Sequence, residues 1–324
     1  MQKQITVSAP GKSMLLGEHA VLYGHPCLVT AVGQRLRASV TVLEESAFQL
    51  DAPDVTVTGY KKQLNDIGTG DIPKGAKFVE TAIKNFYEQY PFKGGLRVET
   101  SSEFSSLFGF GSSSASTVCV ITALSHLYKI NLDKKKLFDL AYKTILDIQG
   151  KGSGFDVAAA LYGGTLYYVI GGKIIEPLEI ETLPLVIGYS GVKADTVTLM
   201  NKVEMVKQKY PDIINDIYVQ IDRLVELAKI AIVNGDWKSL GELMNMNQGY
   251  LESLGVGSAK LSAMIYGACD NGAYGAKLSG AGGGDCMIAL SSPKNKHSVK
   301  AGIEEAGGQV IEVETNVKGV RIEK

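Results

Sequence analysis

The sequence of 324 residues has only four cysteines, four histidines and one tryptophan. The cysteines and histidines are scattered, and no two cysteines have the spacing of a zinc knuckle or a redox pair. We therefore expect no tightly held zinc or iron ion. Cys119 and Cys286 lie in apolar runs, where buried free thiols are typical.

An excess of charge is also missing, because 33 Lys and Arg residues are balanced by 34 Asp and Glu residues, for a net charge of −1. This balance gives no electrostatic reason to expect nucleic acid or an anionic membrane as a partner. Apolar runs such as 165–171 are too short to span a bilayer. The N-terminus shows no charged-then-apolar leader. We expect a cytoplasmic protein.

The chain is long enough for one large or two medium-sized domains. Apolar periodicity predicts helices at 78–90, 115–128, 133–148, 212–233, 237–247, 258–268 and 298–306. Short strands are predicted at 5–8, 36–43, 55–57, 96–100, 165–170, 185–189, 276–278, 287–290, 310–314 and 320–322. The composition changes near 180–184. These patterns predict an α+β fold in two domains, 1–182 and 183–324.

The most informative stretch is Gly109–Ser116, in which two glycines and several small hydroxyl residues precede the apolar run Val118–Tyr128. Glycine lets another group approach the main chain closely, and serines before an apolar run favour a helix start. Free amides and the positive end of the helix dipole coincide there, which favours an anion. We interpret residues 109–116 as a phosphate-binding loop, with an ordinary serine-capped turn as the alternative.

Two well-known phosphate loops do not fit this stretch. The Walker A motif requires a lysine after its last glycine, and no lysine follows Gly111. The dinucleotide fingerprint requires a third glycine, where Ser114 stands, and a strand that leads straight into the loop. The predicted strand 96–100 is separated from the loop by residues 101–108. A nicotinamide-dependent dehydrogenase is therefore disfavoured.

Charged residues between apolar blocks near the N-terminus suggest the edge of a site. A turn signal at Pro10-Gly11 is followed by the cation of Lys12, and Glu18 and His19 come shortly after. A surface loop is the alternative interpretation of this segment.

Two later segments also carry candidate site residues. Asp156 is the one acid in the apolar segment 155–162, where it is either a helix cap or a group with a lysine or a reacting hydroxyl as partner. Residues 280–284 hold four glycines in five positions between two predicted strands. Such a segment predicts a main-chain surface for a flat or charged ligand.

Three stretches together resemble the three motifs of the GHMP small-molecule kinases, in the right order and over almost the whole chain. They are Ala9-Pro10-Gly11-Lys12 with Gly17-Glu18-His19-Ala20-Val21, then Gly109-Phe110-Gly111-Ser112-Ser113, and finally Gly275–Gly283. The resemblance implies a two-domain fold, with a ribosomal S5 domain 2-like N-domain at 1–182 and a ferredoxin-like C-domain at 183–324. ATP and the acceptor would meet between the domains.

The family's roles can be carried over to matching residues. The resemblance implies ATP and Mg²⁺ as cofactors, with Asp156 and Lys12 as catalytic residues and Ser113 as a Mg²⁺ ligand. ATP would be bound by Gly109, Gly111, Ser112, Ser113, Ser114, Gly282 and Gly283. The acceptor would be bound by Glu18, His19, Thr196, Gly280 and Ala281. Such an arrangement suits phosphoryl transfer, which depends on positioning and charge neutralisation. The resemblance leaves open whether Asp156 is a base or a positioning group.

Within the family, the first motif and Leu254-Gly255-Val256 are similar to enzymes of the mevalonate pathway to isoprenoids that phosphorylate mevalonate on its 5-hydroxyl. Three other segments look more like those of enzymes that act on 5-phosphomevalonate, namely residues 149–160, 189–191 and 284–286. That alternative acceptor would need extra cations, for which Lys151 and Lys193 are candidates.

One departure concerns the metal. Ile145 stands where the mevalonate-phosphorylating members carry a second Mg²⁺-binding glutamate, and helix spacing turns the nearby Asp147 to another side.

A non-catalytic ligand sensor with the same fold is a further alternative, although Asp156, Lys12 and the glycine loop are intact. A homodimer is left open.

Overall fold

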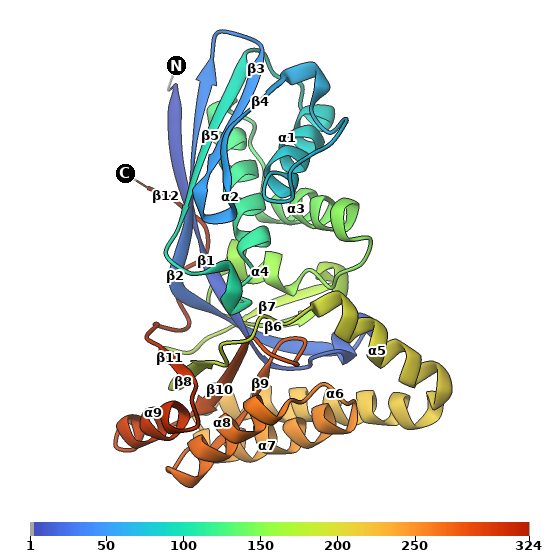
Figure 1. Cartoon of the computed structure of the whole chain (residues 1–324), viewed down its shortest axis with the longest axis vertical. Helices are drawn as coiled ribbons and strands as arrows, with labels where there is room; N and C mark the ends of the chain where they lie inside the picture. Colours follow the sequence, from blue (N-terminus) through green and yellow to red (C-terminus); the bar gives the residue numbers. More distant parts are fainter. Residues whose placement is uncertain (1–2, 324) are drawn as a thin grey trace.

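The computed structural model describes residues 3–323, which form two antiparallel-rich sheets with helices packed against them (Figure 1). In the described chain the larger sheet has eight strands, with the order β12-β1-β2-β5-β3-β4 and with β6 and β7 continuing from β2. The smaller sheet has four strands in the order β11-β8-β10-β9. The predicted α+β fold is confirmed.

The larger sheet is built around two long strands, β1 (Gln4–Leu16) and β2 (Pro26–Leu43). The prediction of a strand limited to 5–8 and followed by a turn was wrong, and the alternative of a surface loop does not hold either, because Glu18 and His19 are buried. Pro10 and Gly11 instead lie at a register shift in the β1–β2 pairing, a place where a sheet tolerates proline. The strand therefore continues past this irregularity and carries Lys12 into the interior.

The remaining strands of this sheet are shorter. They are β3 (Ala47–Ala52), β4 (Val57–Gln63), β5 (Gly95–Ser102), β6 (Thr165–Val169), β7 (Ile174–Leu178) and β12 (Arg321–Ile322). The predictions missed β3 and β7 and placed β4 at 55–57. β3 pairs in parallel with β5, which is a non-local contact that alternation of side chains does not reveal.

Helices α1 (Lys77–Gln89), α2 (Ser112–Leu127) and α3 (Lys134–Gln149) cover one face of the larger sheet (Figure 1). α2 is the most buried of them, with nearly every residue from Ser114 to Leu127 inside the core. This confirms the prediction of a buried helix from its continuous apolar run. α3 also begins within one residue of its predicted start, and the Asp133 carboxylate caps it by accepting the Lys136 N–H at 2.8 Å.

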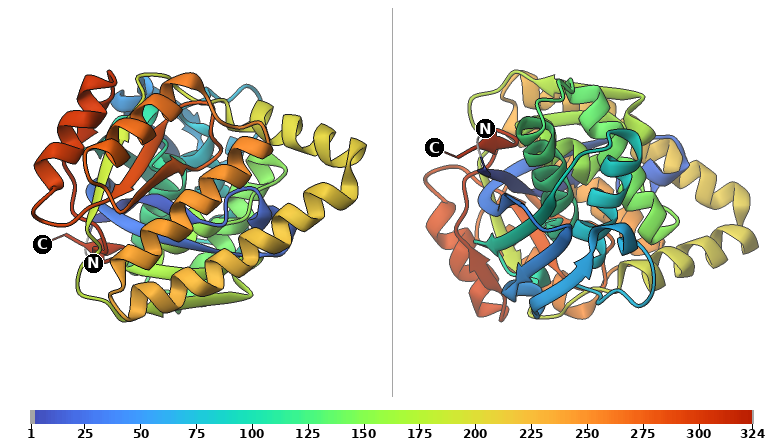
Figure 2. Two further views of the ribbon diagram at one scale, coloured as in Figure 1. Left: turned by 90° about the horizontal axis from the view of Figure 1, so that it is seen from below. Right: turned by 90° about the horizontal axis from the view of Figure 1, so that it is seen from above.

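The smaller sheet consists of β8 (Leu185–Tyr189), β9 (Gly275–Ser279), β10 (Cys286–Leu290) and β11 (Gln309–Ile311). α7 (Trp237–Ser253), α8 (Ala259–Asp270) and α9 (Lys296–Glu305) lie with this sheet, and α5 (Thr196–Lys209) and α6 (Pro211–Val233) extend away from it as a hairpin (Figures 1 and 2). The apolar spacing of α6 predicts a buried stripe of Ile213, Ile217, Ile221, Leu224, Ala228 and Ile232, and this prediction was wrong at its start. Ile213 is 60% exposed, and Ile214 and Tyr218 are buried instead.

The two sheets are not separated in sequence, because the chain returns to the larger sheet at its end. β12 pairs with β1 through Val7 and Ser8. The buried Arg35 guanidinium donates to the carbonyls of Ser8, Lys318 and Gly319 at 2.8–2.9 Å and so fastens this return. The boundary at 182/183 stays a prediction.

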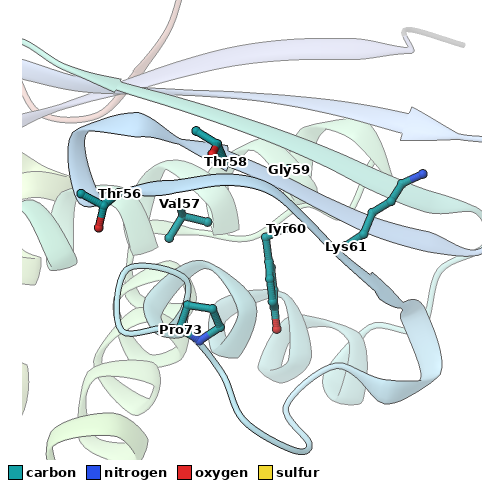
Figure 3. Close-up of a pocket in the computed structure, with 7 residues that line it drawn as sticks. All are labelled: Thr56, Val57, Thr58, Gly59, Tyr60, Lys61 and Pro73. Carbon is teal, nitrogen blue, oxygen red and sulfur yellow. The ribbon is translucent and has the colours of Figure 1, made fainter.

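Two surface features of residues 3–323 bear on function. No helix there is both long and apolar enough to cross a membrane. A shallow hollow lies along the edge strand β4, lined by Thr56–Lys61 and Pro73 (Figure 3). β4 is separated from β1 by three strands, and the hollow contains none of the predicted site residues.

Candidate active site

The predicted phosphate loop is the start of α2. Gly109 and Gly111 have positive φ angles of 71° and 79°, which glycine adopts without steric cost. The first main-chain bond of the helix runs from the Ala115 N–H to the Gly111 carbonyl at 3.0 Å. The amides of Ser112, Ser113 and Ser114 precede it and are the groups that a helix start leaves for an anion.

Lys12 lies against this loop. Its main-chain N–H donates to the Phe110 carbonyl at 3.0 Å, and its Nζ donates to the Gly109 carbonyl at 2.7 Å. Burial lowers the pKa of Lys12, while the charges of Asp156 and Asp285 act in the opposite direction. The Lys12 side chain lies near two carboxylates, and it forms no direct ion pair with either among the described residues.

Asp156 is placed by α4 (Phe155–Tyr162), whose N-cap Gly154 has a φ of 87°. Its Oδ2 accepts the Ser114 hydroxyl at 2.6 Å, and its Oδ1 accepts the Val157 N–H at 3.1 Å. An ideal Cβ built on Gly111 would lie 3.5 Å from the Asp156 Cβ and 3.4 Å from the Lys12 Cγ. The structure thus brings the carboxylate, the lysine and the loop together, as the sequence predicted.

Ser114 can contribute to the site through its side chain as well as its amide. The side chain is buried and donates to Asp156, and the contact of Ser114 with ATP stays a prediction. Ser113 is half-buried, and its carbonyl accepts the hydroxyls of Ser116 and Thr117. The Ser113 hydroxyl makes no recorded hydrogen bond within residues 3–323, which leaves it available to a metal.

The predicted acceptor residues lie where the end of β1 meets β9. Glu18 is buried and pairs with Lys277, and the His19 Nε2–H donates to the Ala281 carbonyl at 3.0 Å. Burial lowers the pKa of His19, so the ring is neutral near pH 7 and its Nδ1 is an acceptor. Next to Ala281, an ideal Cβ on Gly280 would meet no atom within 4 Å.

Three predicted residues lie at the margins of this arrangement. Thr196 is exposed at the first turn of α5. Gly282 and Gly283 pack against the segment before α8: the Gly283 N–H donates to the Val256 carbonyl at 2.7 Å, and a Cβ on Gly282 would lie 2.2 Å from that oxygen. Close packing alone therefore explains these glycines, and their contacts with ATP and acceptor stay predictions.

Two site groups were not among the predicted ones. The Asp285 Oδ2 would lie 2.5 Å from a Cβ on Gly109, which explains why a glycine is needed there. Its Oδ1 accepts the Ala194 N–H at 2.9 Å and lies 3.1 Å from the Lys193 Nζ. The second group is Lys277. Both residues flank the glycine-rich segment 280–284 and lie in stretches that carry the family resemblance, but neither was assigned a role from the sequence.

The residues present fit Mg²⁺ bound together with a nucleotide. In the part of the chain that the structure describes, no three His, Cys, Asp or Glu side chains form a metal cage. Mg²⁺ with a phosphate ligand needs only one or two protein oxygens, and Ser113 and Asp156 lie at the loop that supplies the amides. Asp147, as predicted, is turned away and bonds to Lys143 and Asn85, and Ile145 is buried.

Comparison with known proteins defines the class. Residues 77–164 match the family model of the GHMP kinases N terminal domain, and residues 228–309 match that of the GHMP kinases C terminal. The chain belongs to the GHMP kinase family.

The relatives define the branch more closely. The chain is 34% identical to the mevalonate kinase of Thermococcus sibiricus, over 99% of this chain and 98% of that protein. Among solved structures it is similar to the Methanococcus jannaschii mevalonate kinase, with a TM-score of 0.81, 26% identity and coverage of 97% and 98%. It is also similar to L. major mevalonate kinase in complex with R-mevalonate, with a TM-score of 0.79, 25% identity and coverage of 96% and 95%.

Proposed function

We propose that this chain transfers the γ-phosphoryl group of ATP to the 5-hydroxyl of mevalonate, with ADP as the other product. The observation that carries the proposal is the meeting of Lys12, Asp156 and the free amides of Ser112–Ser114 at one helix start. Relatives named mevalonate kinase that match the chain over nearly its full length support mevalonate as the acceptor.

The loop amides would hold the triphosphate of ATP, and the half-buried Lys12 would stabilise the charge that builds up on the transferring group. Mg²⁺, when bound with ATP through Ser113, supplies neutralisation of the phosphate charge. Asp156 would orient the 5-hydroxyl and accept its proton as the hydroxyl oxygen bonds to the γ-phosphorus and the bond to the ADP oxygen breaks. The Ser114 hydroxyl and Val157 N–H fix the carboxylate for this task.

The state of two lysines favours mevalonate over 5-phosphomevalonate. 5-Phosphomevalonate carries a phosphate group, which would need additional cationic side chains in the acceptor site. The Lys151 Nζ donates to the Asn201 Oδ1 at 2.8 Å, and Lys193 is paired with Asp285. Lys193 is thus already neutralised by a carboxylate, and Lys151 is exposed to solvent.

The testing experiment is a coupled ADP-release assay that offers mevalonate and 5-phosphomevalonate side by side at equal concentration. We expect ATP-dependent and Mg²⁺-dependent ADP release with mevalonate. Turnover of 5-phosphomevalonate alone would replace the proposed acceptor. ATP binding without turnover of either compound would favour a ligand sensor.

A further inference from the structure

A buried ion pair joins the two sheets beside the predicted acceptor residues. Lys277 on β9 and Glu18, just after β1, have side chains that are 0% and 1% exposed. The Lys277 Nζ donates to the Glu18 Oε1 and also to the Leu278 carbonyl at 2.6 Å. Burial lowers the pKa of Lys277, and Glu18 opposes this shift.

Such a pair does not by itself stabilise a fold. Removal of two charges from water costs several kcal/mol per ion, and apolar residues of similar size often serve as well or better. A better-supported role for a buried pair is to fix one local conformation. The surroundings of Glu18 indicate that the turn after β1 is the part that is fixed here.

The second oxygen of Glu18 has no protein partner. Oε2 is buried and makes no hydrogen bond with any residue from 3 to 323. Buried polar atoms in folded proteins nearly always have a partner, and an ionised carboxylate oxygen needs a donor. A ligand hydroxyl is a donor of the required kind.

The neighbours of Glu18 are other residues predicted to bind the acceptor. The next residue, His19, has a φ of 60° and donates to the Ala281 carbonyl. Ser279, two residues after Lys277, accepts the Met14 N–H at 3.0 Å and donates to the Met14 carbonyl at 2.9 Å. These contacts fix the turn after β1 against the glycine-rich segment that begins at Gly280.

We propose that Lys277 is a positioning residue for the acceptor. It holds the buried Glu18 carboxylate through Oε1, so that Oε2 is left to accept a hydroxyl of the acceptor. The proposal rests on the function proposed above, because it assigns part of the site for the acceptor of the same kinase.

A second lysine–glutamate pair provides a matched control. Glu80 is fully buried and pairs with Lys62 at 2.7 Å, but its oxygens also accept the Tyr60 hydroxyl and the Gly68 N–H. Both carboxylate oxygens of Glu80 therefore have partners. Lys62 lies on β4, which is separated from β1 by three strands. Loss of this pair should affect stability without an effect on the acceptor.

The experiment compares Lys277→Met, Glu18→Gln and Lys62→Met with the unmodified protein. It measures KM for acceptor and for ATP, kcat, and the temperature of unfolding. Lys277→Met should raise the acceptor KM about tenfold or more, the factor for one hydrogen bond to a charged group, with the ATP KM little changed. Should Lys277→Met not fold, Lys277→Arg replaces it, since it keeps a cation beside Glu18 but alters the position of the donor, and it should still raise the acceptor KM more than the ATP KM.

The split between the kinetic constants separates positioning from a merely structural role. Without Lys277 the Glu18 Oε1 loses its partner, so the carboxylate is no longer held toward the acceptor. The acceptor KM of Lys277→Met should therefore rise, while the ATP KM and kcat at saturating acceptor stay near those of the unmodified protein. Equal changes in both KM values, or a fall in unfolding temperature alone, would overturn the proposal.

Failure of the proposed function would look different. The unmodified protein would then bind ATP but not phosphorylate mevalonate. If it phosphorylated 5-phosphomevalonate instead, the same variants would be compared with that acceptor. A sensor would be tested by calorimetric binding of mevalonate to the unmodified protein and to Lys277→Met, and equal affinities would overturn the role of Lys277.

Discussion

Lys12 and Lys277 are both lysines on buried strands, and burial lowers the pKa of each, yet their surroundings differ. Lys277 is fully buried and bonded to a carboxylate and a carbonyl. Lys12 is half-buried, donates to the Gly109 carbonyl, and has two carboxylates near it without a direct pair. A lysine that is already paired with a carboxylate of the protein can fix a conformation. A lysine without such a pair can bind a charged substrate. The comparison thus separates the chemistry at the phosphate loop from the positioning at the acceptor side.

The largest expected effect is at the carboxylate beside Lys12. Asp156→Asn keeps the shape of the side chain but removes its charge and its ability to take a proton. We expect kcat to fall by about 10²–10⁴-fold, the range for one general base, while the ATP KM changes little. Single-turnover kinetics with mevalonate would check this, and near-normal turnover would remove Asp156 from the reaction.

The next effect is at Lys12 itself. Lys12→Met should lower kcat by about 10²–10³-fold, as for loss of one group that stabilises transition-state charge. Asp156 and the loop should remain in place, so circular dichroism should show an unchanged fold. An equal loss of kcat in Lys277→Met would erase the distinction between the two lysines.

The lowered pKa of Lys12 also predicts a pH dependence. The protonated form is the active one, so kcat/KM for ATP should decline at alkaline pH as Lys12 loses its proton. Because the pKa is lowered, the decline should begin below the ordinary range of lysine. Lys12→Arg should move the decline to higher pH, since arginine stays charged. The same alkaline limb in both proteins would assign the titration to another group.

A smaller effect is expected at Ser113. Loss of its hydroxyl in Ser113→Ala should weaken the apparent affinity for Mg²⁺ by about tenfold, a loss typical of one group near a metal. The Ser112 hydroxyl, beside it in the same turn, serves as a control through Ser112→Ala. Titration of activity with Mg²⁺ at fixed ATP would measure both. An unchanged Mg²⁺ dependence would contradict ligation by Ser113.

The smallest effect is expected far from both lysines. Ile213 is 60% exposed on α6, so Ile213→Ser should change the free energy of unfolding by no more than about 0.5 kcal/mol. Ile221→Ala, at a fully buried site of the same helix, should cost about 2–5 kcal/mol. Urea denaturation of the two variants would test the corrected orientation of this helix.

Local signals in the sequence were sufficient for much of the fold and the phosphate loop. The glycines and serines of 109–114, the cap at Asp133 and the apolar run of α2 each depend on neighbours in the chain. The pairing of β3 with β5 and the contact of Lys277 with Glu18 depend on residues far apart in sequence. In α6, Ile213 and Ile214 both suit an apolar stripe, and only packing decided which one is buried.

The hydrogen bond of the Ser114 hydroxyl could not be predicted for the same reason. The resemblance placed Ser114 with the ATP ligands, a contact that its amide at the helix start can still make. Its hydroxyl bonds to Asp156, 42 residues further along the chain. Local pattern thus located the site, and tertiary contacts determined which groups are free to bind a ligand.

The most direct test of the central claim is a crystal structure with a non-hydrolysable ATP analogue, Mg²⁺ and mevalonate. We predict that the triphosphate lies on the amides of Ser112–Ser114, with the Lys12 ammonium and the Asp156 carboxylate on either side of the γ-phosphate and the 5-hydroxyl of mevalonate. A triphosphate bound away from residues 109–114, or an acceptor hydroxyl out of reach of Asp156, would contradict the account.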